Sequence, residues 1–203
     1  MNHIKNIIFD LGGVFLDVDY HKTKLQFEEL GIEDFDKYFM QHHSNPLFAN
    51  FEKGLISNED FFDGFRKETH TSFSDEQITF AWNAMLGDFF PDAVDWLLTI
   101  KHKYRVFLFS NTNQVHHDAF IPKFSEKYNL FLDDLFTKAY YSHKLNLRKP
   151  TIESFQAIIN EQGIIPNETL FIDDTEINII GAKQAGLEAV FLKKPMKVNE
   201  LGL

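Results

Sequence analysis

Short apolar runs typical of buried β-strands recur along this chain, and polar clusters follow three of them. Three polar clusters directly follow such a run: Asp10 after residues 6–9, Ser110 after residues 106–109, and Asp173-Asp174 after residues 170–172. A fourth, Lys149 in Arg148-Lys149-Pro150, follows no such run. In a parallel α/β sheet, ligands bind outside the carboxyl ends of the strands, near the point where the strand order reverses. One fold of this class could therefore gather these side chains into one site.

Strands alternate with helices of about ten residues from Gly87 onward, which predicts βαβ units and a parallel sheet. The expected strands are residues 4–9, 105–109, 139–141, 169–172 and 189–192. The expected helices are residues 91–100, a helix that ends near residue 127, residues 152–161 and residues 177–185. Gly163 and Gly186 follow the last two helices, as glycines at helix C-termini often do. We therefore predict an α/β protein.

The segment from about His21 to Leu86 has a helical pattern and contains no convincing strand. Ser57 is expected at the N-cap of one helix, and Ser74 with Gln77 three residues later predicts a capping box at the start of another. We therefore expect an all-helical insert between the first strand and the rest of the sheet.

Composition limits the functions that this chain can have. The 203 residues include no cysteine, which excludes disulfides, thiolate metal sites and cysteine nucleophiles, and the 23 phenylalanines predict a Phe-rich core. The formal net charge of −10 argues against nonspecific nucleic-acid binding and requires any phosphate site to be locally positive. No apolar run approaches the ~18 residues of a membrane span, and residues 1–9 lack a signal peptide's apolar region. We expect a cytoplasmic protein without a nucleic-acid or membrane partner, and we also expect a monomer.

The carboxylates at the strand ends suggest phosphoryl transfer. Asp10 could attack phosphorus in line and form an aspartyl-phosphate, although Asp-x-Gly is also a common turn. Asp173 and Asp174 repel each other, so burying them near a third carboxylate requires a cation, whereas a solvated pair at a helix N-terminus would not. Mg²⁺ fits, with Asp10, the backbone carbonyl of Gly12 and one or both of the paired aspartates as ligands. Asn178 could orient them.

Hydroxyl, amide and ammonium groups at the other two clusters could bind phosphate. Ser110 and Asn111 could donate to phosphoryl oxygens, and a plain helix cap is about equally typical of such a pair. Lys149 precedes Pro150, which places it in a loop, where it could neutralise nucleophile and phosphate together or simply be solvated.

Two histidine pairs lack the i, i+4 spacing of a helical metal site. We expect His42-His43 at the surface. In the second pair, His116-His117, His116 lies one helical turn after Asn113 and is kept as a candidate proton donor.

The four clusters, in this order, resemble the motifs of the haloacid dehalogenase-like superfamily of phosphohydrolases. The matching segments are residues 9–14, 109–113, 148–150 and 171–174 with Asn178. The resemblance covers the whole chain and implies a Rossmann-like sheet of strand order 3-2-1-4-5, formed by residues 1–16 and 87–203. It also implies a helical cap domain of the small four-helix type at residues 17–86. The subgroup it resembles includes a bacterial glucose-1-phosphate phosphatase and the amino-terminal phosphatase domain of mammalian epoxide hydrolase.

The resemblance implies a Mg²⁺-dependent phosphatase that acts on a small phosphorylated metabolite, with sugar phosphates among the candidates. In that interpretation the catalytic residues are Asp10 and Lys149. The substrate-binding residues are Ser110, Asn111 and Lys149, and the metal ligands are Asp10, Gly12, Asp173 and Asp174.

One position departs from the family pattern. Phosphatases of the family usually carry a second aspartate two residues after the nucleophile as general acid/base, and this chain has Gly12 there. General acid/base help is typically worth ~10²–10⁴-fold in rate. Asp17, Asp19 and His116 are the candidate replacements. Two alternatives stay open, a metal-free 2-haloacid dehalogenase-type hydrolase and a catalytically weak binding or regulatory protein, whereas a phosphomutase is disfavoured because Gly12 cannot shuttle a proton.

Overall fold

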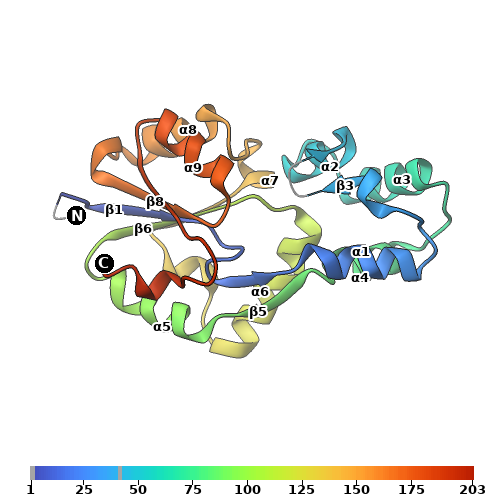
Figure 1. Ribbon diagram of the computed structural model, residues 1–203, viewed down its shortest axis with the longest axis horizontal. Helices are drawn as coiled ribbons and strands as arrows, with labels where there is room; N and C mark the ends of the chain where they lie inside the picture. The colour runs from blue at the N-terminus through green and yellow to red at the C-terminus, as the bar shows by residue number, and fades with distance from the viewer. Residues whose placement is uncertain (1–2, 41–42) are drawn as a thin grey trace.

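A five-stranded parallel sheet forms the centre of the protein. The structure is a computed structural model that describes residues 3–40 and 43–203. The strands lie in the order β7 (Lys138–Tyr141), β6 (Arg105–Ser110), β1 (Asn6–Phe9), β8 (Thr169–Asp173) and β9 (Glu188–Phe191) (Figure 1). Counted among these five alone, the order is 3-2-1-4-5, which confirms the predicted α/β fold.

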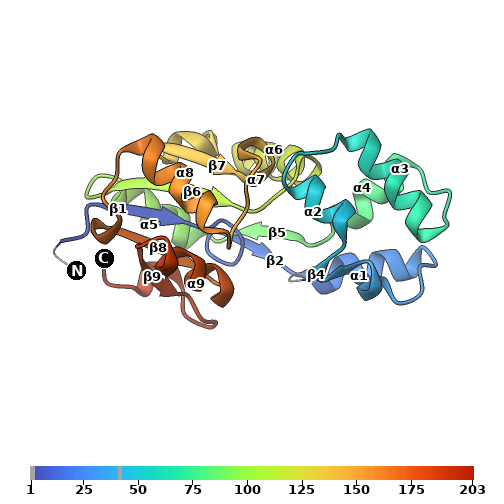
Figure 2. The same cartoon turned by 90° about the horizontal axis from the view of Figure 1, so that it is seen from above.

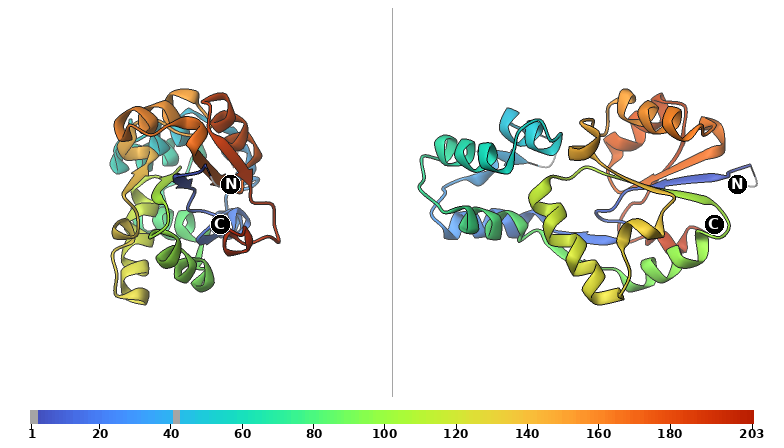
Figure 3. Two further views of the ribbon diagram at one scale, coloured as in Figure 1. Left: turned by 90° about the vertical axis from the view of Figure 1, so that its left-hand side faces the viewer. Right: turned by 180° about the vertical axis from the view of Figure 1, so that it is seen from behind.

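Alternation along the strands sends side chains into two separate apolar clusters, one on each face of the sheet. Ile7 and Phe9 of β1 pack with α5 (Pro91–Ile100) and α6 (Gln114–Tyr128), whereas Ile8 packs with α8 (Ile152–Gln162) and α9 (Glu176–Gln184). The two helix pairs cover opposite faces of the sheet, as the front and back views show (Figures 1 and 3). Both faces of β1 are therefore buried, and polar groups gather where the strand ends.

A third apolar cluster lies among four helices beside the sheet, here called the cap. The cap helices are α1 (Tyr20–Glu29), α2 (Pro46–Glu52), α3 (Asn58–Thr69) and α4 (Asp75–Asn83) (Figure 2). Eight phenylalanines and Trp82 are buried in this cluster, and the rings of Phe51 and Phe61 stack at 4.0 Å between centroids. The Phe-rich core is thus confirmed, as are the Ser57 N-cap and the Ser74–Gln77 capping box.

The prediction that the insert is all-helical is wrong. A small antiparallel pair, β3 (Phe39–Met40) and β4 (His43–Ser44), lies between α1 and α2. A second pair, β2 (Leu16–Val18) and β5 (Leu86–Phe89), connects the sheet to the cap. Strands of two to four residues are too short to show an alternating pattern.

Both ends of the predicted insert fall inside the β2–β5 pair, so the division at residues 16 and 87 stays a prediction. His42 lies outside the described residues, as does the side chain of His43, and their predicted surface position cannot be assigned.

The remaining elements are short. They are α7 (Ser142–Leu145) and four 3₁₀ helices, η1 (Phe35–Lys37), η2 (Leu132–Leu135), η3 (Pro166–Glu168) and η4 (Val198–Glu200). Within residues 3–40 and 43–203, no helix has the length and apolar character needed to cross a membrane.

Candidate active site

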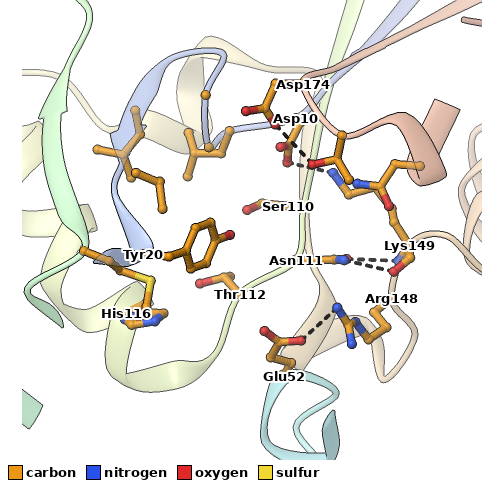
Figure 4. A pocket seen from close by; sticks show the side chains of 18 of the residues that line it. Asp10, Tyr20, Glu52, Ser110, Asn111, Thr112, His116, Arg148, Lys149 and Asp174 are labelled. Atoms are coloured by element: carbon orange, nitrogen blue, oxygen red, sulfur yellow. Dashed lines mark hydrogen bonds and ion pairs between the residues drawn. The ribbon is translucent and has the colours of Figure 1, made fainter. Parts of the chain in front are cut away.

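Three carboxylates meet at the carboxyl ends of the neighbouring strands β1 and β8. Phe9 lies opposite Ile172 in the parallel register, so Asp10 and Asp173 follow at the same edge of the sheet. Asp10, Asp173 and Asp174 each offer a carboxylate oxygen within 4.8 Å of the other two. The sequence expectation that these residues converge is met (Figure 4).

Lys149 supplies the positive charge among them. Its side chain is 1% exposed, and its ammonium group donates hydrogen bonds of 2.7 Å to Asp10 Oδ1 and of 2.7 Å to Asp173 Oδ2. The loop that carries it is fastened by Asn111, whose side-chain amide donates to the Lys149 carbonyl at 2.9 Å and accepts from the Lys149 N–H at 2.9 Å. Lys149 is therefore buried and paired, which rules out the solvated loop lysine.

Burial dominates the electrostatics of the carboxylates. It raises the pKa of Asp10 to about 7, because desolvation and the charges of Asp173 and Asp174 together outweigh the opposing charge of Lys149. Burial, followed by the charge of Asp173, also raises the pKa of Asp174. For Lys149, burial alone would lower the pKa, but its two carboxylate partners raise it above the usual value. Three carboxylates against one ammonium leave two negative charges in excess when all are ionised.

Asp173 is held from both sides. Its Oδ1 accepts a hydrogen bond of 2.8 Å from the Thr175 N–H, and its Oδ2 accepts one of 3.0 Å from Asn178 Nδ2. The second contact is the orienting role predicted for Asn178. A carboxylate fixed in this way is preorganised for a ligand.

The turn after Asp10 brings backbone against the third carboxylate. Gly13 has φ +68°, and a Cβ at this position would lie 1.9 Å from Asp174 Oδ2, so only glycine leaves room for that side chain. Gly12 has no such backbone, and a Cβ there would lie 3.2 Å from Val18 Cγ2. The left-handed position of the turn is thus Gly13, whereas the missing acid is at Gly12.

A cavity of about 400 Å³ opens between this cluster and the cap. Ser110, at the end of β6, lies in its wall together with Asp10 and Gly12. The wall also includes polar and aromatic side chains that had no role in the sequence-based prediction, among them Tyr20, Glu52, Trp82, Thr112 and Arg148. Tyr20, Glu52 and Trp82 lie on ordinary amphipathic helices, so no sequence signal distinguishes them. Arg148 was recognisable only as the neighbour of Lys149.

Tyr20 extends from the first residue of α1 into this cavity (Figure 4). Desolvation raises the pKa of its hydroxyl, and the negative charges of Glu52 and Asp10 raise it further. The hydroxyl therefore keeps its proton at neutral pH and is available as a hydrogen-bond donor.

None of the three residues proposed from the sequence as a replacement acid is well placed. His116 lines the cavity, but burial lowers its pKa to about 3, and its ring stacks on Trp82 with Nδ1 2.8 Å from Asn83 Oδ1. Asp19 caps α1 by accepting from the His21 N–H at 3.1 Å. Asp17 and Asp19 are not among the described residues that line the cavity.

The comparisons with known proteins agree with this geometry. The model of the haloacid dehalogenase-like hydrolases matches residues 4–186, which is most of the chain. The chain belongs to this family. It is therefore a hydrolase of the haloacid dehalogenase type, as the motif order implied.

Relatives are found in sequence and in structure. D-ribitol-5-phosphate phosphatase from Bacteroides thetaiotaomicron is 34% identical over 186 residues, which cover 91% of this chain and 90% of the relative. A crystal structure of a HAD family enzyme from the same organism, an aspartate-to-alanine mutant in complex with magnesium and inorganic phosphate, superposes with a TM-score of 0.93 at 35% identity and covers 98% of each chain. A predicted HAD-like family hydrolase from Porphyromonas gingivalis superposes with a TM-score of 0.87 at 29% identity, covering 95% of this chain and 93% of the other.

Proposed function

We propose that this protein is a Mg²⁺-dependent phosphatase that hydrolyses the phosphate monoester of a small sugar or polyol. The observation that carries the proposal is the excess of two negative charges where Asp10, Asp173 and Asp174 share a single lysine. The relative named as a D-ribitol-5-phosphate phosphatase and the related structure with magnesium and phosphate support it.

The residues at this edge of the sheet fit a divalent cation. Oxygen ligands from one or two carboxylates, completed by water and phosphate, are what Mg²⁺ usually takes in proteins. Asp10, Asp173 or Asp174 and the carbonyl oxygen of Gly12 would hold it, and a +2 charge would cancel the excess. When bound, the ion would supply charge neutralisation between the carboxylates and the incoming phosphate.

Asp10 would act as the nucleophile. One of its carboxylate oxygens would form a bond to phosphorus while the ester P–O bond breaks, and water would then hydrolyse the aspartyl-phosphate to release phosphate. The Lys149 ammonium, hydrogen-bonded to Asp10, would hold the carboxylate in position and oppose the rise of its pKa, and Ser110 would donate to a phosphoryl oxygen. Asn111 would act by fixing the Lys149 loop, to which both polar atoms of its side-chain amide are hydrogen-bonded.

Tyr20 would assist the leaving group. Gly12 offers no side chain, whereas the protonated Tyr20 hydroxyl points into the cavity from the cap. A hydrogen bond from this hydroxyl would stabilise the negative charge that develops on the leaving oxygen. The predicted acids Asp17, Asp19 and His116 are less suited, for the reasons of position and pKa given above.

Turnover of D-ribitol 5-phosphate and p-nitrophenyl phosphate, with Mg²⁺ and with EDTA, tests the proposal. We expect hydrolysis of both esters that EDTA abolishes and added Mg²⁺ restores. Mg²⁺ should also raise the melting temperature, because a ligand of the folded state alone stabilises it by about 2.7 kcal/mol at 100 times its Kd.

Two other outcomes would identify the alternatives. EDTA-insensitive release of chloride from 2-chloropropionate, with no ester hydrolysis, would indicate the metal-free dehalogenase, which the uncompensated carboxylates disfavour. A rise in melting temperature with Mg²⁺ but no turnover of either ester would indicate the weak binding protein that Gly12 leaves open. The cytoplasmic location and the monomeric state stay predictions.

A further inference from the structure

An ion pair between the cap and the sheet domain crosses the wall of the cavity. Glu52, the last residue of α2, lies with its Oε2 3.1 Å from an Nη of Arg148, the residue directly before Lys149. The two side chains are 14% and 26% exposed. In Figure 4 they lie at the end of the cavity away from Asp10 and Asp174, with Ser110, Asn111 and Thr112 between.

The pair leaves hydrogen bonds unmade. Within the part of the chain that the structure describes, the buried atoms Glu52 Oε2 and Arg148 Nε have no hydrogen-bond partner, because the ion pair lacks hydrogen-bond alignment. Buried polar atoms in native proteins are nearly always hydrogen-bonded. Both residues line the cavity and their side chains are partly exposed, so a ligand there would meet the exposed part of an ion pair whose own hydrogen bonding is incomplete.

Folding alone does not favour a carboxylate at the position of Glu52. A carboxylate in the last turn of a helix faces the negative end of the helix dipole, and the last turn of α2 carries no basic residue. Burial also raises the pKa of Glu52, against the opposing charge of Arg148. Neither the helix nor burial favours a carboxylate here, which points to a role toward a ligand.

The end of α2 is nevertheless fixed against the sheet domain. The Ser142 hydroxyl donates to the Glu52 carbonyl at 2.7 Å, and Asn146 Nδ2 donates to the Lys53 carbonyl at 2.8 Å. At Gly54, a Cβ would lie only 2.0 Å from the His143 carbonyl oxygen, so the two backbones are in close contact. The Glu52 carboxylate is thereby held in a defined place relative to Arg148 and Lys149.

We propose that the Glu52–Arg148 pair determines specificity by selecting a neutral, hydroxyl-bearing leaving group, an inference that rests on the phosphatase function proposed above. One hydroxyl of the substrate donates to the Glu52 carboxylate, and a neighbouring oxygen accepts from Arg148. Because Glu52 cancels the charge of Arg148, a second anionic group on the substrate meets no net electrostatic attraction at this end of the cavity. Polyol and sugar monophosphates are thus accepted, and phosphorylated carboxylic acids are rejected.

The test compares two probes, D-ribitol 5-phosphate and 3-phosphoglycerate, on the wild type and on Glu52→Gln. The substitution keeps the shape of the side chain but leaves the charge of Arg148 uncompensated. We expect the ratio of kcat/KM for the polyol ester over the acid to fall at least tenfold, through a higher KM for the polyol and a lower KM for the acid. Glu59→Gln, an exposed change on the same cap, is the matched control and should leave the ratio unchanged.

Two further variants separate a change of specificity from weaker docking of the cap on the sheet domain. In Glu52→Gln/Arg148→Gln the gain with 3-phosphoglycerate should disappear, because the freed positive charge is gone. In Arg148→Gln alone the acid should lose at least tenfold more kcat/KM than the polyol, which keeps the test usable if Glu52→Gln fails to fold. Melting temperatures of all variants report on cap docking.

Two results would overturn the inference. An unchanged ratio in Glu52→Gln would do so, whether or not both probes lose activity equally, and an equal loss for both would indicate a purely structural pair. If the wild type hydrolyses no phosphate ester at all in Mg²⁺, the proposed function fails and the inference fails with it, whereas turnover with an unchanged ratio removes the inference alone.

Discussion

The two ends of the cavity are built differently. At the carboxylate end, formed by Asp10, Lys149, Asp173 and Asp174, short hydrogen bonds link Lys149 to Asp10 and Asp173, and the carboxylates lie where two strands of a closely packed sheet end. At the distal end, formed by Glu52 and Arg148, the two side chains meet at the boundary between the cap and the sheet domain, and one buried polar atom of each has no hydrogen-bond partner among the described residues. The difference suggests separate roles for the two ends. The carboxylate end would bind the phosphate, which is common to all substrates, and the distal end would bind the leaving group, which varies.

The largest effect is expected at the carboxylate end. Asp10→Asn should reduce phosphatase turnover by at least ~10³-fold, because an amide cannot form the acyl-phosphate and loss of a nucleophile is among the costliest changes in an enzyme. The melting temperature without Mg²⁺ should be equal or higher, since the amide matches the carboxylate in shape and removes one of three buried negative charges. Steady-state kinetics and thermal melting measure both.

Asp95→Asn, an exposed change on α5, is the matched control and should behave as the wild type. Retention of a tenth or more of wild-type turnover by Asp10→Asn would contradict the covalent mechanism, and with it the view that the carboxylate end carries the chemistry.

The carboxylate end is also the part that sequence reasoning reached. Buried parallel strands are short, continuous apolar runs, and their register carries Asp10 and Asp173 to one edge without further information. The family resemblance that the four motifs carry then implied the strand order, which the structure confirms. The β3–β4 pair was missed because two residues per strand carry no period.

The distal end could not be predicted from the sequence for a physical reason. Glu52 and Arg148 are 96 positions apart in the numbering and meet only because the end of α2 docks on α7 and its loop. That docking depends on the close contact at Gly54 and on side-chain hydrogen bonds to carbonyls, none of which leaves a periodic signal. Likewise, the sequence shows two adjacent glycines but not that Gly13, rather than Gly12, takes the left-handed backbone.

The two adjacent glycines after Asp10 should differ in their effect on stability. Gly13→Ala should destabilise the protein by about 1–3 kcal/mol, because a side chain at φ +68° is strained and its Cβ would collide with the Asp174 carboxylate. Gly12→Ala should cost less than about 1 kcal/mol, since the nearest atom is a side-chain methyl group of Val18 at 3.2 Å. Urea denaturation of the two variants measures this difference.

The same pair also tests the metal proposal. Gly13→Ala should weaken the rise in melting temperature produced by Mg²⁺, because it displaces Asp174, while Gly12→Ala should keep it. Equal stability and equal Mg²⁺ response in the two variants would show that the Gly13 backbone and the Asp174 carboxylate are not packed as described.

Tyr20 lies between the two ends, and its role can be isolated by varying the leaving group. Tyr20→Phe should slow hydrolysis of ribitol 5-phosphate about tenfold, the lower part of the range for general acid or hydrogen-bond assistance, and should slow p-nitrophenyl phosphate much less. An alkoxide needs the hydrogen bond that a nitrophenolate does not. An equal reduction of kcat for both esters would show that Tyr20 does not stabilise the leaving group, and the assisting group would then have to be sought elsewhere in the cavity.

The smallest effect concerns the contact that holds the distal end in place. Burial, with the nearby charges of His117 and Lys144, lowers the pKa of His143 to about 4, from about 6.5 in the unfolded chain. Between these values the unfolded chain binds more protons than the native one, so the free energy of unfolding falls as the pH falls through this window. The His143 contribution to this loss is about 1 kcal/mol at pH 5.5.

His143→Gln should therefore lose less stability than the wild type between pH 7.5 and 5.5. His102→Gln, a change at an exposed histidine, is the matched control and should lose as much stability as the wild type. Equal losses of stability in His143→Gln and in the wild type over this pH range would show that His143 is not buried with a lowered pKa as described.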